Sequence, residues 1–341
     1  MREADQAVGA AVGMGRPGRG RPTRVRVRVP ATTANLGPGF DTLGMALSLY
    51  NYFDVEPCAS GCHVEAEGEA LARVPQGADN LVIRAAQAVW ERAGLPPTGW
   101  RVRLRAEIPL GCGLGSSASA IVGGVVAANA LAGEPLSTGE LLAIAAELEG
   151  HADNVTPAMV GGFTVAAMSA HGAQARPSVH WVRFPAHGLR AVVAIPDVEL
   201  PTQQSRRILP HQVGFEDAAF NVSRACLLVA GLTAGDACAV AAALDDRLHQ
   251  PYRAALVPGF HAVVQAAREA GALGAVLSGA GPAVLALVSE DQPVARIGDA
   301  MTGAFTAAGV SARWLALTPD DTGAVVEAPI DEDQQGDDAR L

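Results

Sequence analysis

The chain has 341 residues, which is enough for two modest domains that share a cleft. Its net charge of -10 argues against nucleic acid as the main partner. It has no uninterrupted run of about 18 apolar residues, so we expect no membrane-spanning segment. Five scattered cysteines, an odd number, indicate a reducing compartment and therefore a cytoplasmic protein.

The two ends of the chain have compositions that predict no packed structure. Residues 1–22 are rich in Gly, Ala and Arg without periodicity, and we expect a disordered extension there. Residues 329–341 are expected to form an acidic, solvated tail. Between them the pattern of predicted elements restarts near residue 178, which suggests one domain over 23–175 and a second over 176–328.

The first predicted element is a strand over residues 24–29, in which Arg and Val alternate. It leads into residues 30–47, a segment rich in Gly and Pro that carries Asn35 and Asp41. Composition alone makes this segment a tight turn between strands. The next predicted elements are strands over 50–56 and 62–67, a helix over 84–93 with Asn80 near its start, and a strand over 100–106.

Residues 109–117 read Pro-Leu-Gly-Cys-Gly-Leu-Gly-Ser-Ser and precede a predicted helix over 118–132. The alternating glycines let the backbone take positive φ and approach a ligand closely. The first turn of a helix offers unpaired N–H groups and a partial positive charge, so the combination favours a phosphate site. The serine hydroxyls suit Mg²⁺. A serine-capped turn would explain the glycines alone equally well.

Two other phosphate loops are excluded by residue type and spacing. The P-loop and the protein-kinase motifs both need a lysine, and this chain contains none. The glycine spacing also differs from the G-x-G-x-x-G of dinucleotide-binding folds.

The second half of the chain contains further predicted helices, strands and polar turns. A predicted helix over 139–149 is followed by a polar turn, His151-Ala-Asp-Asn154, and a strand that begins near Gly162. Later segments are two strand-like runs at 179–184 and 189–195, a basic stretch at 202–210, helices at 220–231 and 237–245, the sequence Leu248-His-Gln-Pro-Tyr-Arg253, and a strand–glycine turn–strand at 274–287.

Several of these segments resemble motifs of one superfamily. Residues 109–117 match the P-x-G-x-G-L-G-S-S loop of the GHMP kinases at every position. Residues 29–41 resemble the V-P-A-x-x-A-N-L-G-x-G-F-D opening of the homoserine kinases in that superfamily. Their E-G-H-x-D-N-V-x-P-A-x-x-G-G, T-x-x-A-R-x-x-L-P and H-Q-P-Y-R motifs resemble residues 149–162, 202–210 and 249–253. Residues 274–287 resemble the third GHMP motif, a loop that closes against the phosphate loop.

The resemblance spans roughly residues 24–326 and implies a fold and an activity. The fold is a two-domain α+β GHMP kinase fold, with an N-terminal domain like ribosomal protein S5 domain 2 and a ferredoxin-like C-terminal domain. The activity is homoserine kinase: ATP-dependent phosphorylation of L-homoserine to O-phospho-L-homoserine, on the route to threonine, with Mg²⁺. A GHMP kinase for another small hydroxy-acid, or a ligand-binding sensor without turnover, is the alternative. A homodimer is compatible with the resemblance, and the sequence does not determine the oligomeric state.

The resemblance also implies roles for individual residues. Asn35, Asp41, His151, Asn154, Arg206 and Arg253 are expected to bind the amino acid, with Asp41 meeting its ammonium and the two arginines its carboxylate. Ser117 and Glu149 are expected to hold Mg²⁺, with Glu147 as the alternative ligand. The nucleotide is expected to contact Asn80, Pro109, Leu110, Gly111, Cys112, Gly113, Leu114, Gly115, Ser116, Ser117, Ala118, Ser119 and Thr202.

The expected catalytic set is Asn154, Glu149 and Ser117. Many GHMP kinases carry an Asp as general base where this chain has Asn154, and an amide cannot accept a proton at neutral pH. We therefore expect no strong protein base, and catalysis by alignment, Mg²⁺ and the helix N-terminus.

Overall fold

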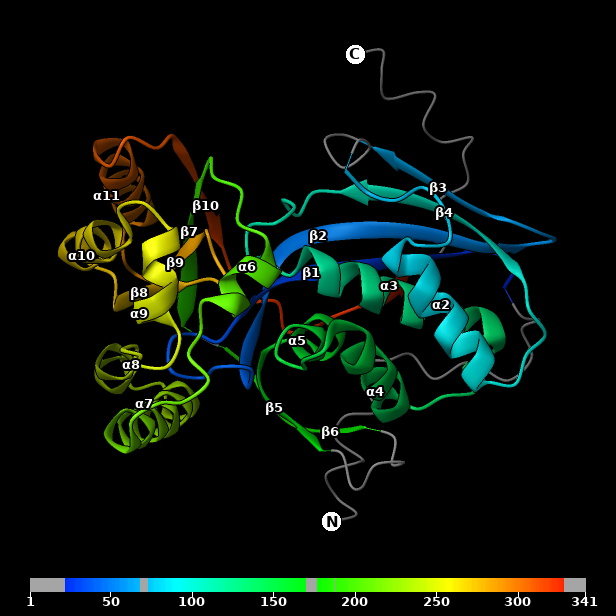
Figure 1. The fold of residues 1–341 in the computed structure, drawn as a ribbon, viewed down its shortest axis with the longest axis horizontal. Helices are drawn as coiled ribbons and strands as arrows, with labels where there is room; N and C mark the ends of the chain where they lie inside the picture. The colour runs from blue at the N-terminus through cyan, green and yellow to red at the C-terminus, as the bar shows by residue number, and fades with distance from the viewer. Residues whose placement is uncertain (1–21, 68–72, 170–176, 187, 328–341) are drawn as a thin grey trace.

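The computed structural model describes residues 22–67, 73–169, 177–186 and 188–327. The predicted N-terminal extension, except for residue 22, and the predicted acidic tail, residues 329–341, lie outside these ranges. The described chain forms two α/β lobes side by side, each with its own sheet (Figure 1). Among the described helices none is long and apolar enough to span a membrane.

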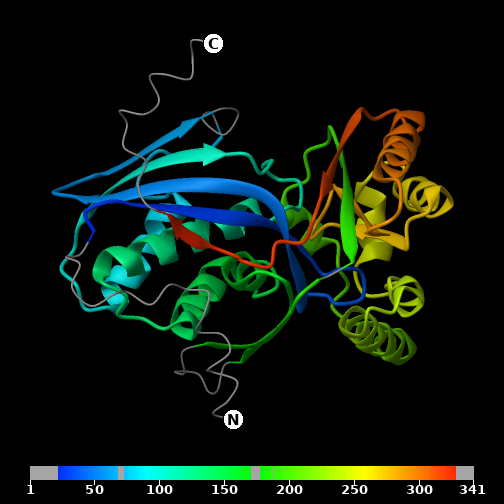
Figure 2. The ribbon, with the colours of Figure 1, turned by 180° about the vertical axis from the view of Figure 1, so that it is seen from behind.

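The first lobe is a mostly antiparallel sheet covered by helices on one face (Figure 2). Its strands run in the order β11-β1-β2-β4-β3, and β5 and β6 continue from one end of β2. The strands are β1 (Val25–Ala34), β2 (Leu43–Cys58), β3 (Cys62–Glu67), β4 (Gly99–Ala106), β5 (Phe163–Ser169), β6 (Ser178–Phe184) and β11 (Val325–Glu327). The helices are α2 (Leu81–Arg92), α3 (Ser116–Ala132), α4 (Thr138–Glu149) and α5 (Val155–Val160).

Alternating strand residues build the core of this lobe. Val25, Val27 and Val29 of β1 point to the helices and are buried, as the Arg–Val alternation predicts. Helix α3 lies at the centre, and it is built of small residues because it is buried nearly all round. Its packing is close: a Cβ at Gly123 would meet the Phe53 ring at 2.5 Å.

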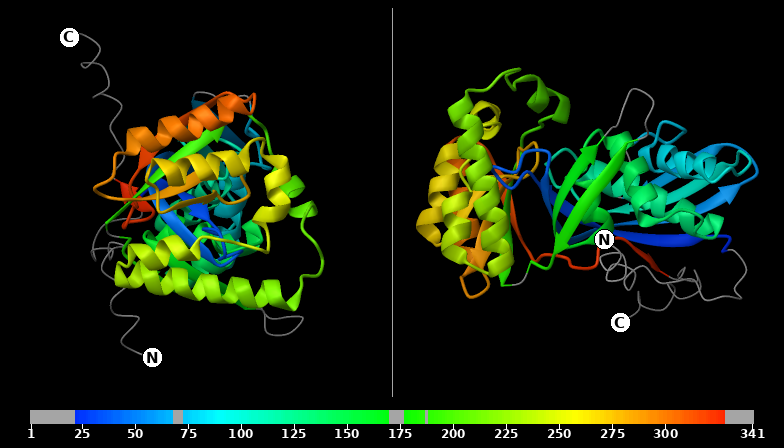
Figure 3. Two further views of the ribbon diagram at one scale, coloured as in Figure 1. Left: turned by 90° about the vertical axis from the view of Figure 1, so that its left-hand side faces the viewer. Right: turned by 90° about the horizontal axis from the view of Figure 1, so that it is seen from below.

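The second lobe is a four-stranded antiparallel sheet in the order β10-β7-β9-β8. This is the ferredoxin-like order expected from the resemblance, with α10 and α11 on one face (Figure 3). The elements are β7 (Leu189–Pro196), α6 (Thr202–Arg207), α7 (Phe215–Ala234), α8 (Ala237–Ala243), α9 (Gln250–Arg253), the 3₁₀ helix η2 (Ala254–Leu256), α10 (Phe260–Ala270), β8 (Gly274–Leu277), β9 (Val284–Ser289), α11 (Val294–Ala307) and β10 (Ala312–Leu317).

Two predictions about the strands are wrong. The turn predicted over residues 30–47 is shorter, because β1 continues to Ala34 and β2 already begins at Leu43. The pairing register shifts between Pro30 and Ala31, and this irregularity lets the proline sit within a paired strand. The run at 179–184 does not open the second sheet, because β6 pairs antiparallel with β5 in the first one.

Candidate active site

The glycine loop connects β4 to α3 and presents its backbone to a cavity of about 330 Å³ between the lobes. Gly111, Gly113 and Gly115 have φ values of 69°, 82° and 70°, which only glycine adopts without strain. Helix α3 begins at Ser116, so its first N–H groups face the loop. A row of donors at a helix N-terminus can hold a polyphosphate.

A second glycine turn supports the loop from behind. The Ser278 hydroxyl donates to the Gly113 carbonyl at 2.7 Å, and the Ala283 N–H donates to the Cys112 carbonyl at 3.2 Å. A Cβ on Gly113 would lie 2.0 Å from the Ser278 carbonyl oxygen. The turn at 278–281 therefore closes against the glycine loop, as the resemblance implies.

Ser117 and Glu149 meet where α3 begins and α4 ends. The Ser117 hydroxyl donates to Glu149 Oε2 at 2.7 Å, and both residues line the cavity. Glu147 is exposed and does not line the cavity. No group of three or more His, Cys, Asp or Glu residues in the described ranges could hold a metal by itself. The pair offers two hard oxygen donors, which suit Mg²⁺ shared with phosphate oxygens.

Asn154 has a fixed amide orientation. Its Oδ1 accepts a hydrogen bond from the Thr32 hydroxyl at 2.8 Å, and both residues are buried. The amide nitrogen is therefore a donor: one of its hydrogens is directed to Asp153 Oδ1 at 3.5 Å, and the other remains for a ligand. Thr32 in turn donates its N–H to the Leu114 carbonyl of the glycine loop. One residue of β1 thus holds the glycine loop through its backbone and Asn154 through its side chain.

His151 and Asp153 form a close pair beside Asn154. His151 Nδ1 lies 2.5 Å from Asp153 Oδ1, and Asp153 is 2% exposed. Burial would lower the pKa of His151, but the hydrogen bond to Asp153 and the charges of Asp153 and Glu149 together raise that pKa above its ordinary value. The pair fixes the ring at one wall of the cavity.

The far end of the cavity carries an ion pair and a second arginine. Arg206 donates to both carboxylate oxygens of Asp41, at 2.8 and 3.1 Å. Arg253 is 1% exposed, and burial followed by the charge of Arg206 lowers its pKa to about 10. Both guanidinium groups lie near the Phe40 ring, at 5.8 and 5.3 Å from its centroid. Asp41 and Arg206, which are expected to bind opposite ends of an amino acid, thus bind each other in this structure.

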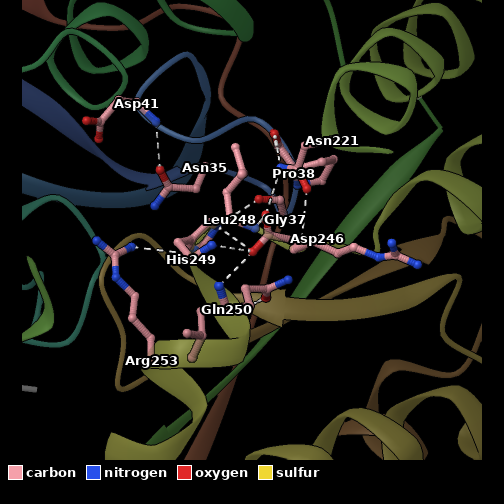
Figure 4. Close-up of polar contacts among 12 residues, drawn as sticks. Asn35, Gly37, Pro38, Asp41, Asn221, Asp246, Leu248, His249, Gln250 and Arg253 are labelled. Carbon is pink, nitrogen blue, oxygen red and sulfur yellow. Dashed lines mark hydrogen bonds and ion pairs between the residues drawn. The ribbon is translucent and has the colours of Figure 1, made fainter. Parts of the chain in front are cut away.

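Two of the expected ligand-binding side chains have structural partners. Asn35 accepts from the Asp41 N–H at 3.0 Å and donates to the Gly279 carbonyl at 2.8 Å, so it fixes the β1–β2 loop (Figure 4). Asn80 caps α2 by accepting from the Val82 N–H at 2.9 Å and donates to the Pro75 carbonyl at 2.7 Å. Both residues line the cavity, so contact with a ligand stays a prediction.

The cavity brings together nearly all of the predicted site residues. Those that line it are Asn35, Asp41, Asn80, Pro109, Leu110, Gly111, Cys112, Gly113, Leu114, Gly115, Ser116, Ser117, Glu149, His151, Asn154, Thr202, Arg206 and Arg253. Ala118 and Ser119 are fully buried in α3 and do not line it. Ser119 instead accepts a hydrogen bond from Asn51 at 2.8 Å.

Sequence reasoning missed three residues with contacts at the site. Thr32 orients Asn154, Phe40 underlies both arginines, and His249 contacts Arg253. Thr32 and Phe40 lie within the opening motif, and His249 begins the H-Q-P-Y-R motif. Membership in these motifs is the sequence signal that points to all three. The motifs do not indicate which distant residue each of these side chains contacts.

The fold and the glycine loop define a kinase of the GHMP superfamily. The family models for the GHMP kinases N terminal domain and the GHMP kinases C terminal match residues 80–162 and 228–307. The chain is 47% identical to homoserine kinase of a Synechococcus species over 89% of this chain and 98% of that relative, and it belongs to the homoserine kinase family.

Two further comparisons agree with this membership. The chain is 46% identical to homoserine kinase of Moorella thermoacetica over 88% of this chain and 99% of that relative. The crystal structure of homoserine kinase from Cytophaga hutchinsonii superimposes with a TM-score of 0.82 at 32% identity, covering 92% of this chain and 100% of that one.

Proposed function

We propose that this protein transfers the γ-phosphate of ATP to the side-chain hydroxyl of L-homoserine, which yields ADP and O-phospho-L-homoserine for threonine biosynthesis. One observation carries the proposal. A single cavity has a glycine loop with a helix N-terminus at one end and the charged set Asp41, Arg206 and Arg253 at the other. Nucleotide phosphates fit the first end, and a small zwitterion fits the second.

The nucleotide end supplies backbone donors rather than a lysine. In the proposed complex the N–H groups of the glycine loop and of Ser116 and Ser117 surround the phosphates. Asn80 lies beside the adenine, and Thr202 lies beside the phosphates. Because these donors are fixed by the fold, they need no rearrangement when charge moves between phosphate oxygens.

We propose Ser117 and Glu149 as the Mg²⁺ ligands and prefer them to Glu147, whose side chain is exposed and does not line the cavity. When bound there, Mg²⁺ would neutralise charge on the transferring phosphate. The distance of 2.7 Å between Ser117 Oγ and Glu149 Oε2 supports this assignment, since the two oxygens can share one ion.

The amino-acid end works by exchange of ion pairs. In the proposed complex the substrate ammonium takes the place of Arg206 at Asp41, and the substrate carboxylate takes the place of Asp41 at Arg206. Arg253 adds a second guanidinium to the carboxylate. Each charge that leaves the internal ion pair thus finds a new partner, so a zwitterion binds without leaving either charge unpaired in the cavity.

The transfer step forms a bond between the homoserine side-chain oxygen and the γ-phosphorus and breaks the bond from that phosphorus to the β–γ bridging oxygen. The hydroxyl proton leaves late, to solvent or to a phosphate oxygen. Asn154 orients the hydroxyl through its amide nitrogen and cannot act as a base. His151 binds the substrate beside it. This fits phosphoryl transfer, which depends mainly on positioning and charge stabilisation.

Five cysteines that form no disulfide bond support a cytoplasmic location.

The proposed activity is tested by incubating the purified protein with ATP, Mg²⁺ and L-homoserine, measuring ADP release and identifying the product by mass spectrometry. L-Homoserine should be turned over in preference to mevalonate, L-serine and L-threonine. Turnover of another hydroxy-acid alone would identify a different kinase, and binding without turnover would identify a sensor.

A further inference from the structure

Arg253 is held at the amino-acid end of the cavity by uncharged acceptors. Its Nη1 lies 3.2 Å from His249 Nδ1 and 3.3 Å from the Gly279 carbonyl, and its Nε donates to the Ser205 carbonyl at 3.2 Å. No carboxylate in the described ranges forms an ion pair with this guanidinium. A buried arginine without a counter-ion is aimed by its neutral partners, and His249 is the only one of these that can change protonation state.

The contacts of His249 determine which ring nitrogen carries the proton. Nε2 lies 2.8 Å from the Gly37 carbonyl, which can only accept a hydrogen bond (Figure 4). Nε2 must therefore carry the hydrogen. Nδ1 faces the Arg253 guanidinium, which can only donate, so Nδ1 must offer a lone pair. A single form satisfies both contacts: the neutral ring protonated on Nε2.

His249 is itself held rigidly by its surroundings. Asp246 is fully buried and accepts hydrogen bonds from the N–H groups of Leu248, His249 and Gln250, at 3.0, 3.0 and 2.6 Å. Asn221 of α7 donates to the same carboxylate at 2.8 Å. This network fixes the backbone of His249, and the Phe40 ring lies 5.3 Å from the imidazole.

We propose that His249 is a positioning residue that holds the Arg253 guanidinium toward the substrate carboxylate and ties it, through Gly37, to the loop that carries Asp41. One imidazole then fixes the spacing between the carboxylate-binding and ammonium-binding groups. Protonation of His249 replaces the lone pair at Nδ1 with an N–H that opposes Arg253. The inference deepens the proposed function and rests on it for the identity of the substrate.

The proposal carries a pH dependence with a definite sign. The charged groups around the ring are Asp246, whose Oδ2 lies 3.5 Å from Nε2, together with Arg253 and Asp41. Burial lowers the pKa of His249 below its ordinary value, although Asp246 opposes this shift. The ring is therefore neutral at neutral pH. Affinity for the amino acid should be full there and should decrease as acid protonates the ring.

The tautomer can be tested without any substrate. In ¹⁵N spectra of histidine-labelled protein, the His249 signals are those that disappear in His249→Asn. They should indicate a protonated Nε2 and an unprotonated Nδ1 at about pH 8.5, above the ordinary titration range of imidazole. A ring protonated on Nδ1, or on both nitrogens at this pH, would overturn the proposal whatever the substrate is.

The positioning role is tested by substrate kinetics of matched variants. His249→Asn retains an acceptor near the position of Nδ1, whereas His249→Gln and His249→Leu remove it. We expect the latter two to raise KM for L-homoserine by about 10-fold or more, the usual effect of losing a hydrogen bond to a charged group. KM for ATP should change little, and His249→Asn should regain most of the affinity. His261→Gln, on the exposed side of α10, is the control.

The pH profile distinguishes positioning from a merely structural role. Wild-type KM for L-homoserine should rise only at pH values below the ordinary imidazole range, because burial lowers the pKa of His249, and this rise should be absent in His249→Asn. Equal increases of KM in all three variants, or an acid limb in His249→Asn with the same midpoint and size as in the wild type, would refute the proposal. Absence of any wild-type turnover of L-homoserine would refute the proposed function instead, while the tautomer measurement still decides the geometry.

Discussion

In the proposed complex Asp41 and Arg206 change partners when the amino acid binds, and this proposed exchange accounts for selectivity at the level of single residues. The pair is bidentate and half-exposed, so it can open without a large desolvation cost. A substrate that lacks either charge would leave one member of the pair without a partner in the cavity. Such analogues should bind poorly even though they have fewer polar groups to desolvate.

Arg206→Leu tests this exchange, with Arg207→Leu as the matched control. Arg207 is the next residue on α6 and is exposed, so its loss should leave the kinetics unchanged. Loss of Arg206 removes a charge-assisted contact to the substrate carboxylate, and KM for L-homoserine should rise roughly 10- to 150-fold. KM for ATP should change far less. Equal increases in both KM values would indicate that Arg206 serves the phosphates instead.

Glu149→Gln tests the assignment of the metal ligand, and Glu147→Gln provides a control from the same helix turn. A glutamine keeps the size of the side chain but removes the charge that binds Mg²⁺. Turnover should therefore decrease by about 100-fold or more, because the ion that neutralises the transferring phosphate is bound poorly. The control should keep its activity, since Glu147 is exposed. Near-normal turnover of Glu149→Gln across a Mg²⁺ titration would show that the assignment is wrong.

At the scale of elements, the sequence predicts those parts of the fold whose signals are local. The helix α4 illustrates this, because Ser137 and Glu140 form a capping box at its start and Gly150 ends it. The β1–β2 hairpin was predicted poorly, since Gly and Pro in residues 30–47 indicate a turn. Long-range pairing of residues 31–34 with 44–47 overrides that local preference.

The site follows the same division between local and long-range information. Motifs in which neighbouring residues carry the signal predict the glycine loop, Ser117 and Glu149. The hydrogen bond from Thr32 to Asn154 joins residues 122 positions apart, and the contact between His249 and Gly37 joins residues 212 positions apart. No local pattern encodes such contacts, so the sequence predicts candidate functional groups but not what orients them.

The contact between the two glycine turns gives a prediction with an internal control. Ala at position 113 would place its Cβ 2.0 Å from the Ser278 carbonyl oxygen, whereas a Cβ at position 111 has no neighbour within 4 Å. Both positions have positive φ, which costs about 1–2 kcal/mol for a residue with a side chain. Overpacking adds about 1–3 kcal/mol, so Gly113→Ala should lower the free energy of unfolding more than Gly111→Ala. Equal urea midpoints for the two variants would show that the glycine loop and the turn at 278–281 are not in close steric contact.

At the scale of the whole molecule, the two lobes share a hydrophobic core although each has its own sheet. The first part of β2, with Leu43, Met45 and Leu47, packs into a core that also contains Val193 and Leu285 of the second sheet. The rest of β2 packs with the helices of the first lobe through Phe53 and Val55. After β10 the chain also returns to the first sheet, where β11 pairs with β1.

This shared core predicts that the protein unfolds in one step. A cooperative unit forms when neither half keeps a complete core without the other. Leu285→Ala deletes buried atoms of the shared core and should lower the free energy of unfolding by about 2–5 kcal/mol. Val182→Ala in β6 is the control, because Val182 is 55% exposed and its loss should change little.

The readout is hydrogen exchange by mass spectrometry across a urea series. Peptides from β9 in the second lobe and from α3 in the first should lose protection at the same urea concentration in the wild type. In Leu285→Ala both sets should shift to lower urea together, because the loss of packing in the shared core weakens the fold of both lobes. A shift confined to the β9 peptides, with α3 unchanged, would mean that the lobes unfold separately and that the site between them can open without loss of either lobe.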